Sequence, residues 1–409
     1  MKQLVIIGKT FPEPHSTAAG KRMLQLIDLF QAQKYQITFL SSATASENSF
    51  DLTQKNITVQ HILLNDASFD EVIKKLNPEI VIFDRFTTEE QFGWRVSEQV
   101  PNAIKILDTE DLHFLRSARE TAFKQNRTAE NSDFINDVFK REIAAILRCD
   151  LSLIISEFEM ELLTHHFKID KNILRYLPLF AYNKRSKASF LERKNFVSIG
   201  NFLHEPNWQT VLQLKKLWPF IKKQLPEAQI HIYGAYASEK VYQLHNEKEG
   251  FLIKGRAEKV ETVFNDARVL LAPIPFGAGI KGKLLESMEL GLPNVTSSIG
   301  AEAMHGNIPW NGFITDNETE FIEKAVLLYQ DETTWKLAQE NGYRIAEEKF
   351  KKELFENDFW ERILNISKNL EEHRNANFLG QILQHHTLQS TRYLSKWIEE
   401  KNKKENPEL

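Results

Sequence analysis

A segment rich in glycine and lysine, residues 276–283 (FGAGIKGK), has the composition of a phosphate-binding loop. It follows an apolar run without alternation, residues 269–273, which is typical of a strand buried on both faces of a parallel sheet. It leads into a helical stretch that is stopped by Gly291 and Pro293. A strand, a glycine loop and a helix N-terminus can together bind a diphosphate, because the backbone approaches closely and the first helical N–H groups point at the anion. The residues expected to form this site are Gly277, Ala278, Gly279, Ile280, Lys281 and Lys283.

Two lysines and one glutamate of this segment have distinct expected roles. Lys281 and Lys283 place positive charge where a diphosphate would gain negative charge if it were a leaving group. Glu286 lies about one turn into the helix, where its carboxylate can accept hydrogen bonds from a ribose diol. The alternative is a glycine-rich turn in which Glu286 merely pairs with Lys283 on the helix surface. The combination of glycines, lysines, carboxylate and helix stop favours the nucleotide site.

A second set of reactive side chains follows the apolar run at residues 104–108. Asp111 and His113 are expected at the carboxyl end of this strand, and we predict that they take part in catalysis together with Lys281. In the alternative, Asp108 or Thr109 caps the next helix, while acidic residues after them favour its positive end.

Two further polar segments follow predicted strands. The first loop carries Ser16, Thr17 and Gly20, small residues that let a ligand approach the next helix, although Ser16 or Thr17 could equally be its N-cap. Ser156 and Glu159 have the spacing of a capping box, and we favour that structural role for them.

The elements that must position these residues alternate between short apolar runs and longer amphipathic stretches, which predicts parallel sheets covered by helices on both faces. The pattern restarts at Phe196, so we predict an α/β protein with two doubly wound, Rossmann-like domains, residues 1–185 and 190–350. Residues 351–409 form a helical segment that packs back on the N-terminal domain or mediates association. Ligands should bind in the cleft between the carboxyl ends of the two sheets. The predicted strands are residues 4–8, 36–41, 80–84, 104–108, 152–156, 196–200, 229–234, 251–254, 269–273 and 294–297, and the predicted helices are 20–33, 69–76, 89–98, 136–147, 208–224 and 259–265.

The composition of the chain limits the ligands and the cellular compartment that we expect for it. The 409 residues carry a formal net charge of -4, which argues against nucleic acid as the ligand. The single cysteine excludes an intramolecular disulfide and fits a reducing compartment. No apolar run is long enough for a signal peptide or a membrane span, so we expect a soluble, cytoplasmic protein. Peripheral contact at the inner face of a membrane, through the basic segment 165–194, is the alternative to a solvated linker, which is favoured. The oligomeric state is left open.

The donor-side motifs support a resemblance to a known family. Residues 277–302 resemble the donor-site signature of GT-B glycosyltransferases of the retaining group 1, or family 4, type, including the loop Ile299-Gly300-Ala301-Glu302. The similarity extends through residues 196–208 (FVSIGNFLHEPNW), 230–234 and 251–258 (FLIKGRAE). It therefore covers most of the second domain.

The resemblance implies a GT-B fold in which Glu286 binds the nucleotide ribose and the segment with Gly255 and Arg256 borders the base. Two departures from the family pattern concern the donor. Ala278 stands where many members have a glutamate that contacts the transferred sugar, and Asn201 stands where many carry an Arg/Lys pair; Asn201 is kept in the predicted donor site.

The implied activity is transfer of a sugar from a nucleoside-diphosphate sugar to a saccharide or glycoconjugate acceptor hydroxyl, with retention, in polysaccharide or glycoconjugate biosynthesis. The first loop would line the acceptor side. No cofactor beyond the nucleotide sugar and no metal are expected, since GT-B enzymes generally work without a metal. A sugar-nucleotide epimerase and a non-catalytic, glycosyltransferase-like partner subunit are the alternatives. The sequence does not specify the base, the sugar, the acceptor or the linkage.

Overall fold

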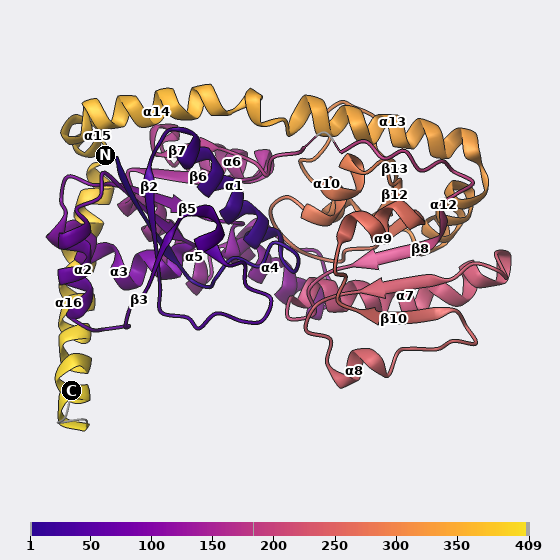
Figure 1. Ribbon diagram of the computed structural model, residues 1–409, viewed down its shortest axis with the longest axis horizontal. Helices are drawn as coiled ribbons and strands as arrows, with labels where there is room; N and C mark the ends of the chain where they lie inside the picture. Colours follow the sequence, from indigo (N-terminus) through magenta and orange to yellow (C-terminus); the bar gives the residue numbers. More distant parts are fainter. Residues whose placement is uncertain (1, 183, 406–409) are drawn as a thin grey trace.

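The computed structural model describes residues 2–182 and 184–405, and it contains two parallel α/β domains (Figure 1). The N-terminal sheet has the strand order β3-β2-β1-β4-β5-β6-β7, and the C-terminal sheet has the order β10-β9-β8-β11-β12-β13. Neighbouring strands pair in parallel in both sheets. The predicted fold class, two doubly wound Rossmann-like domains, is confirmed.

The strands lie close to their predicted positions. All ten predicted strands are present, and three more occur: β3, β7 and β13, each at the edge of a sheet. The strands are β1 (Gln3–Gly8), β2 (Gln36–Ser41), β3 (Thr58–His61), β4 (Ile80–Asp84), β5 (Ile104–Asp108), β6 (Leu151–Ile154), β7 (Leu174–Tyr176), β8 (Lys194–Ile199), β9 (Ile230–Tyr233), β10 (Phe251–Gly255), β11 (Ala267–Ala272), β12 (Asn294–Thr296) and β13 (Gly312–Ile314).

Helices cover both faces of each sheet. Those of the N-terminal domain are α1 (Ala18–Ala32), α2 (Ser68–Leu76), α3 (Phe86–Gln99), α4 (His113–Lys124), α5 (Asp137–Arg148) and α6 (Glu157–Glu161). Those of the C-terminal domain are α7 (Glu205–Gln224), α8 (Glu239–Tyr242), α9 (Val260–Asp266), α10 (Gly282–Glu289), α11 (Ser298–Ala301), α12 (Glu318–Gln330) and α13 (Glu332–Lys349). The chain ends with α14 (Glu356–Lys368), α15 (Leu370–Ala376) and α16 (Phe378–Glu405).

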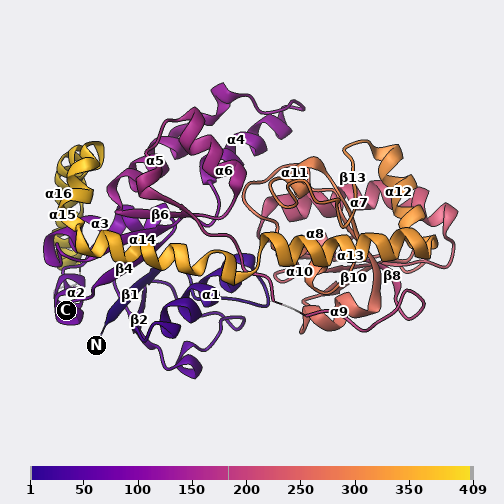
Figure 2. The same cartoon turned by 90° about the horizontal axis from the view of Figure 1, so that it is seen from above.

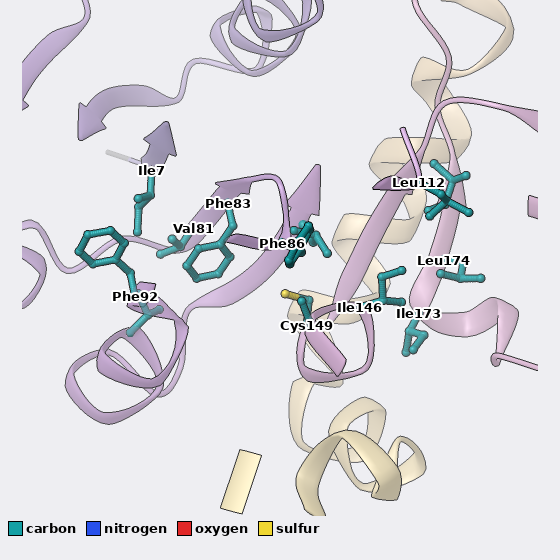
Figure 3. Packing of buried hydrophobic residues seen from close by; sticks show 14 of the residues in the cluster. Ile7, Val81, Phe83, Phe86, Phe92, Leu112, Ile146, Cys149, Ile173 and Leu174 are labelled. Atoms are coloured by element: carbon teal, nitrogen blue, oxygen red, sulfur yellow. The ribbon is translucent and has the colours of Figure 1, made fainter. Parts of the chain in front are cut away.

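The N-terminal sheet separates two apolar cores because side chains alternate along each strand. Ile7, Val81 and Phe83 face one core with helices α2 to α5, and Figure 3 shows part of this cluster, including the buried Cys149. Leu4 and the other alternating positions face the second core, under α1. Both faces of the sheet are therefore closed to solvent, so a ligand can reach the sheet only at the ends of its strands.

The C-terminal helices return to the N-terminal domain. Phe359, Ile363 and Ile366 of α14 are buried in the second core, beside α1. In Figure 2, α13 and α14 run nearly end to end across both domains. Helix α16 then contacts α3 and α5.

The chain therefore crosses between the domains twice, once after β7 and once after α13 (Figure 2). The two crossings are bonded to each other, because the Ala181 N–H donates to the Phe350 carbonyl at 2.8 Å. The first crossing is also anchored to α1, where Arg22 donates to the carbonyls of Leu177 and Pro178.

Some basic residues of the segment 165–194 have partners within the protein, although most of them are exposed. Lys184 pairs with Glu261 and Arg185 with Glu347. Arg193 is fully buried and donates to backbone carbonyls of the C-terminal domain. No helix in the described part of the chain is long and apolar enough to cross a membrane. Peripheral membrane contact stays a prediction.

Candidate active site

A cavity of about 610 Å³ lies between the two domains. Its walls come from the loops at the carboxyl ends of β1, β4, β5, β8, β9, β10 and β11, where doubly wound sheets bind ligands. Most of the residues predicted from the sequence line this cavity: Ser16, Thr17, Asp111, His113, Asn201, Arg256, Gly277, Ala278, Ile280, Lys281, Lys283 and Glu286. Three do not line it, namely Gly20, Gly255 and Gly279.

The glycine loop between β11 and α10 lies against the N-terminal domain. Gly279 has a φ of +62°, and a Cβ at this position would lie 2.9 Å from Cβ of Asp111. Gly282, the first residue of α10, approaches Ala18 so closely that an added Cβ would lie 2.8 Å from the Ala18 Cβ. The N-termini of α10 and α1 therefore meet at the cavity, which concentrates helix N–H groups where an anion could bind.

Lys281 and Lys283 lie in the cavity wall with different partners. Lys281 Nζ donates to the carbonyls of Gly279, at 2.7 Å, and Ala278, at 3.3 Å. Lys283 Nζ donates to Oδ1 of Asn207 at 2.7 Å. Burial lowers the pKa of Lys281 to about 8 and the pKa of Lys283 to about 7. Within the described part of the chain, neither lysine donates a hydrogen bond to a carboxylate, so both can respond to an anionic ligand.

Glu286 forms an ion pair with Lys21 of α1, across the cleft. The alternative interpretation, a pair between Glu286 and Lys283, is wrong, because Lys283 turns to Asn207 instead. Burial lowers the pKa of Lys21 to about 8. Glu286, the carboxylate that is expected to bind a ribose, thus lies in the cavity wall and pairs with a lysine of the N-terminal domain.

Asp111 and His113 lie together on the N-terminal wall. Asp111 Oδ1 accepts a hydrogen bond from Arg116 at 2.7 Å and lies 3.4 Å from Nε2 of His113. Although burial opposes it, the charge of Arg116, with a smaller effect of His113, lowers the pKa of Asp111 to about 2. Burial lowers the pKa of His113 to about 3, so its imidazole is neutral near pH 7. Asp111 is the ionised member of this pair.

The alternative in which Asp108 or Thr109 caps the following helix is wrong. The N-cap of α4 is Leu112, without a side-chain cap, because two carboxylates from other helices accept its free N–H groups. Glu142 accepts from the N–H groups of His113 and Phe114, at 3.1 and 2.9 Å. Asp108 instead pairs with Arg22, and Thr109 bonds to a carbonyl of β6: Arg22 Nη2 lies 3.0 Å from Asp108, and Thr109 Oγ1 lies 2.9 Å from the Leu153 oxygen.

The capping box expected for Ser156 and Glu159 is also wrong. Ser156 makes no side-chain cap bond. Glu159 is fully buried, and its Oε1 accepts from the N–H of Leu112 and from the N–H of Gly279, both at 2.9 Å. Burial raises the pKa of Glu159 to about 8. Glu159 therefore holds the glycine loop of one domain to the first turn of α4 in the other.

A second contact that the sequence analysis did not predict joins the glycine loop to the N-terminal domain. Arg119 of α4 donates to both carboxylate oxygens of Glu302, at 2.6 and 2.8 Å, and to the Gly277 carbonyl at 2.7 Å. Glu302 belongs to the Ile-Gly-Ala-Glu loop, but its partner is far away in sequence. Arg119 and Glu159 could have been found in the sequence from their position. They lie on α4 and α6, which begin at the carboxyl ends of β5 and β6, where polar side chains reach the cleft.

Two more missed residues lie just after neighbouring strands: Arg85 follows β4 directly, and Glu110 is the second residue after β5. Both have left-handed φ angles, 70° and 66°, which are uncommon for residues with side chains and are concentrated at functional sites. In the first loop, Thr17 is the N-cap of α1 and accepts from the Gly20 N–H at 2.9 Å, so the capping interpretation holds for Thr17. Ser16 Oγ is buried at the cavity, without a hydrogen-bond partner in the described structure.

The site has no ligand set typical of a protein-bound metal. Within residues 2–182 and 184–405, no group of three or more His, Cys, Asp or Glu side chains could hold a metal ion. The charges available for a diphosphate in this cavity come from lysines, arginines and helix N-termini.

Comparisons with known proteins agree with this geometry. Residues 193–331 match the family model described as glycosyl transferases group 1. A search of curated proteins finds no match to the chain.

The similar solved structures cover nearly the whole chain. A mutant of TarM from S. aureus, in complex with fondaparinux, alpha-GlcNAc-glycerol and UDP, has a TM-score of 0.69 and 11% identity, covering 90% of this chain and 100% of that one. Sucrose-phosphate synthase from Thermosynechococcus elongatus has a TM-score of 0.69 and 13% identity, covering 90% and 99%. The pneumococcal O-GlcNAc transferase GtfA, in complex with UDP and GlcNAc, has a TM-score of 0.67 and 13% identity, covering 89% and 99%.

Proposed function

Because the chain has the GT-B fold and its second domain is of the group 1 glycosyl transferase type, we propose that it transfers a sugar from a nucleoside-diphosphate sugar to an acceptor hydroxyl, with retention of anomeric configuration. The observation that carries the proposal is the grouping of Lys281, Lys283 and Glu286 around the N-terminus of α10, in the wall of the interdomain cavity. This arrangement places two cationic side chains and one carboxylate in the wall of one cavity, as binding of a diphosphate and its ribose would require. Transfer would serve polysaccharide or glycoconjugate synthesis.

The donor is bound by residues of the C-terminal domain. The diphosphate lies at the first turn of α10, where backbone N–H groups and the two lysines stabilise it. Glu286 accepts from the ribose hydroxyls, and Arg256, after β10, lies toward the base. No metal is required, because these cationic groups already offset the charge of the leaving group. UDP is the first nucleotide to test, since the structures of TarM and GtfA contain it.

The reaction breaks the bond between the anomeric carbon and the phosphate oxygen and forms a bond from the acceptor oxygen to that carbon. The departing phosphate takes the acceptor proton, so that atoms and charge balance without a protein base. Asp111, which is ionised beside the glycine loop, faces the transferred sugar and stabilises positive charge that develops on its ring. Neutral His113 lies beside Asp111, with its Nε2 3.4 Å from Oδ1.

Closure of the domains keeps water away from the donor. Glu159 and Arg119 tie the glycine loop to the N-terminal domain through the contacts to Gly279, Gly277 and Glu302. Water excluded at this edge cannot compete with the acceptor hydroxyl.

Nucleotide binding and donor turnover test the proposal. A thermal-shift panel of UDP, GDP, ADP and their sugars should raise the melting temperature with one base, since a ligand that binds only the folded state stabilises it. Glu286→Gln should weaken binding of that nucleotide roughly 10-fold or more, the value of a charged hydrogen bond. Glu323→Gln, on the exposed face of α12, is the matched control and should bind normally.

The outcomes separate the alternatives. Transfer or slow hydrolysis of the donor supports a glycosyltransferase. An isomerised sugar nucleotide would support the epimerase instead, and binding without any turnover would support a non-catalytic subunit. Unchanged affinity in Glu286→Gln would remove this residue from the ribose site.

A further inference from the structure

Helix α16 lies along one outer edge of the N-terminal domain, at the end of the molecule away from the C-terminal domain (Figure 1, Figure 2). One face of this helix is fixed to the domain. Gln384 donates to the carbonyl of the last residue of α5 at 2.8 Å, and Ser395 donates to Asn65 at 3.1 Å. Glu399 pairs with Arg95 of α3. These contacts hold α16 over most of its length.

The opposite face of α16 carries six large apolar side chains, and each of them is between 50% and 67% exposed. At about 100° per residue, they point roughly 180° away from the side chains that hold the helix to the domain. They form an N-terminal cluster and a C-terminal cluster, with three residues each: Phe378, Leu379 and Ile382, then Tyr393, Leu394 and Trp397. Together they expose about 600 Å², as much as the largest apolar patch of a typical monomer, which marks an interaction site.

The spacing of the two clusters indicates what covers them. Their centres lie about 22 Å apart along the helix. Residues 384–390 between them (QHHTLQS) are mostly polar. A membrane surface favours a continuous apolar face. A second α16 that runs in the opposite direction instead places each cluster on the other one, which is the self-complementary arrangement of a two-fold dimer.

The charges at the two ends of the helix also favour an antiparallel pair. Lys396 and Lys403 are exposed beside the C-terminal cluster, and Glu371 and Glu372 of α15 are exposed just before the N-terminal cluster. Parallel copies would bring like charges together, whereas antiparallel copies bring the lysines of one toward the glutamates of the other. An anionic membrane would meet charges of both signs.

We propose that α16 is a dimerisation helix, through which two copies of the chain pair antiparallel about a two-fold axis near residues 387–388. The N-terminal cluster of each copy packs on the C-terminal cluster of the other. The contact covers about 1,200 Å² in total, at the lower end of the range for specific interfaces. No residue of α16 is among the described residues that line the interdomain cavity, so pairing leaves the cleft open and is independent of sugar transfer.

The oligomeric state of the full chain tests the proposal. Sedimentation equilibrium at about 100 μM, above the micromolar dissociation constants of weak interfaces of this size, should give twice the mass of one chain. Leu394→Lys places a charge in the C-terminal cluster and should raise the dissociation constant roughly 100-fold or more, because the two-fold axis repeats the change. Leu337→Lys, on α13, is the matched control: Leu337 is 65% exposed, and this variant should stay dimeric.

A spin label attached to Lys396→Cys tests the direction of pairing. Residue 396 lies about eight residues from the axis, so two labels in an antiparallel pair should lie roughly 25–30 Å apart, whereas labels in a parallel pair would lie within roughly 15 Å. The native Cys149 is buried and should stay unlabelled.

Folding of each variant is checked by circular dichroism, and Trp397→Ser replaces Leu394→Lys if that protein does not fold. A wild-type chain that is monomeric at this concentration, a Leu394→Lys protein that dimerises like the wild type, or a short distance between the labels would overturn the proposal. Monomers that bind phosphatidylglycerol vesicles, and lose this binding in Trp397→Ser, would assign α16 to a membrane surface instead. UDP binding should be the same in dimer and monomer, so none of these outcomes bears on the proposed sugar transfer.

Discussion

Burial of single side chains at the cavity sets how they respond to a ligand. Lys283 has an aliphatic stem and a partly buried ammonium bonded to the amide oxygen of Asn207, and desolvation lowers its pKa to about 7. A diphosphate binds the protonated form, so binding raises this pKa again. By linkage, affinity is greatest at and below pH 7 and falls as the pH rises through that value, until the pKa of the complex is reached.

Nucleotide affinity should therefore decrease between pH 7 and pH 8.5, by up to about tenfold per pH unit from this one group. Lys283→Arg keeps its charge throughout this range, so the decrease should become shallower. Isothermal titration of both proteins with UDP across these pH values measures the slopes. Parallel slopes would show that Lys283 does not carry the pH dependence.

Residue types were predictable from the sequence, but partners were not. The glycines, lysines and the carboxylate of the α10 segment were expected at a ligand site, and the structure places most of them around one cavity. The partner of Glu286 is Lys21, from the first helix of the chain. The spacing of Ser156 and Glu159 predicts a local capping box. In the structure, Glu159 instead accepts a hydrogen bond from the N–H of Gly279, which is distant in sequence. Local spacing contains no information on contacts made across the cleft.

At the level of the elements, the strands missed by the sequence patterns all lie at sheet edges. Every residue of β3 is exposed, and β7 and β13 have three residues each. Central strands are buried on both faces and form apolar runs that stand out in the sequence. An edge strand needs only one neighbour, and its exposed residues carry no such pattern. The sequence patterns therefore missed three of the four edge strands, whereas the mostly buried edge strand β10 and the central strands that position the site were predicted.

Helix α14 is an integral part of the N-terminal core. Phe359 is fully buried and its ring packs edge-on against Phe30 of α1, with centroids 5.8 Å apart. Phe359→Ala should destabilise the protein by about 3–5 kcal/mol, the typical loss for a buried phenylalanine. Leu364→Ala, on the exposed face of the same helix, should change stability by less than about 0.5 kcal/mol. Urea unfolding measures both, and equal effects would contradict the core role of α14.

For the whole molecule, closure depends on a small number of polar contacts across the cleft. Arg119 makes several of them, since it binds Glu302 and the Gly277 carbonyl. Arg119→Gln should shift the protein toward open forms, seen as a larger radius of gyration in small-angle scattering with UDP bound. It should also lower kcat/KM for transfer roughly 10-fold or more, the value of a charged, part-buried contact, and raise the share of donor lost to hydrolysis.

Arg127 provides the matched control, because its pair with Asp133 is exposed and lies within the N-terminal domain. Arg127→Gln should leave the scattering profile and the transfer rate as they are. An Arg119→Gln protein that scatters and hydrolyses donor like the wild type would show that closure is held by other contacts.

The bond between Ala181 and Phe350 has a mechanical consequence. Two rigid bodies joined by one flexible tether keep nearly all their relative degrees of freedom. Here two crossings join the domains and are hydrogen-bonded to each other, and we expect this to restrict their relative motion chiefly to rotation about one axis. We expect each closure to follow the same path, which would bring Glu159 to Gly279 and Arg119 to Glu302. The relative orientation of the two domains would then be set at the interdomain crossings and not by the residues that bind the ligands.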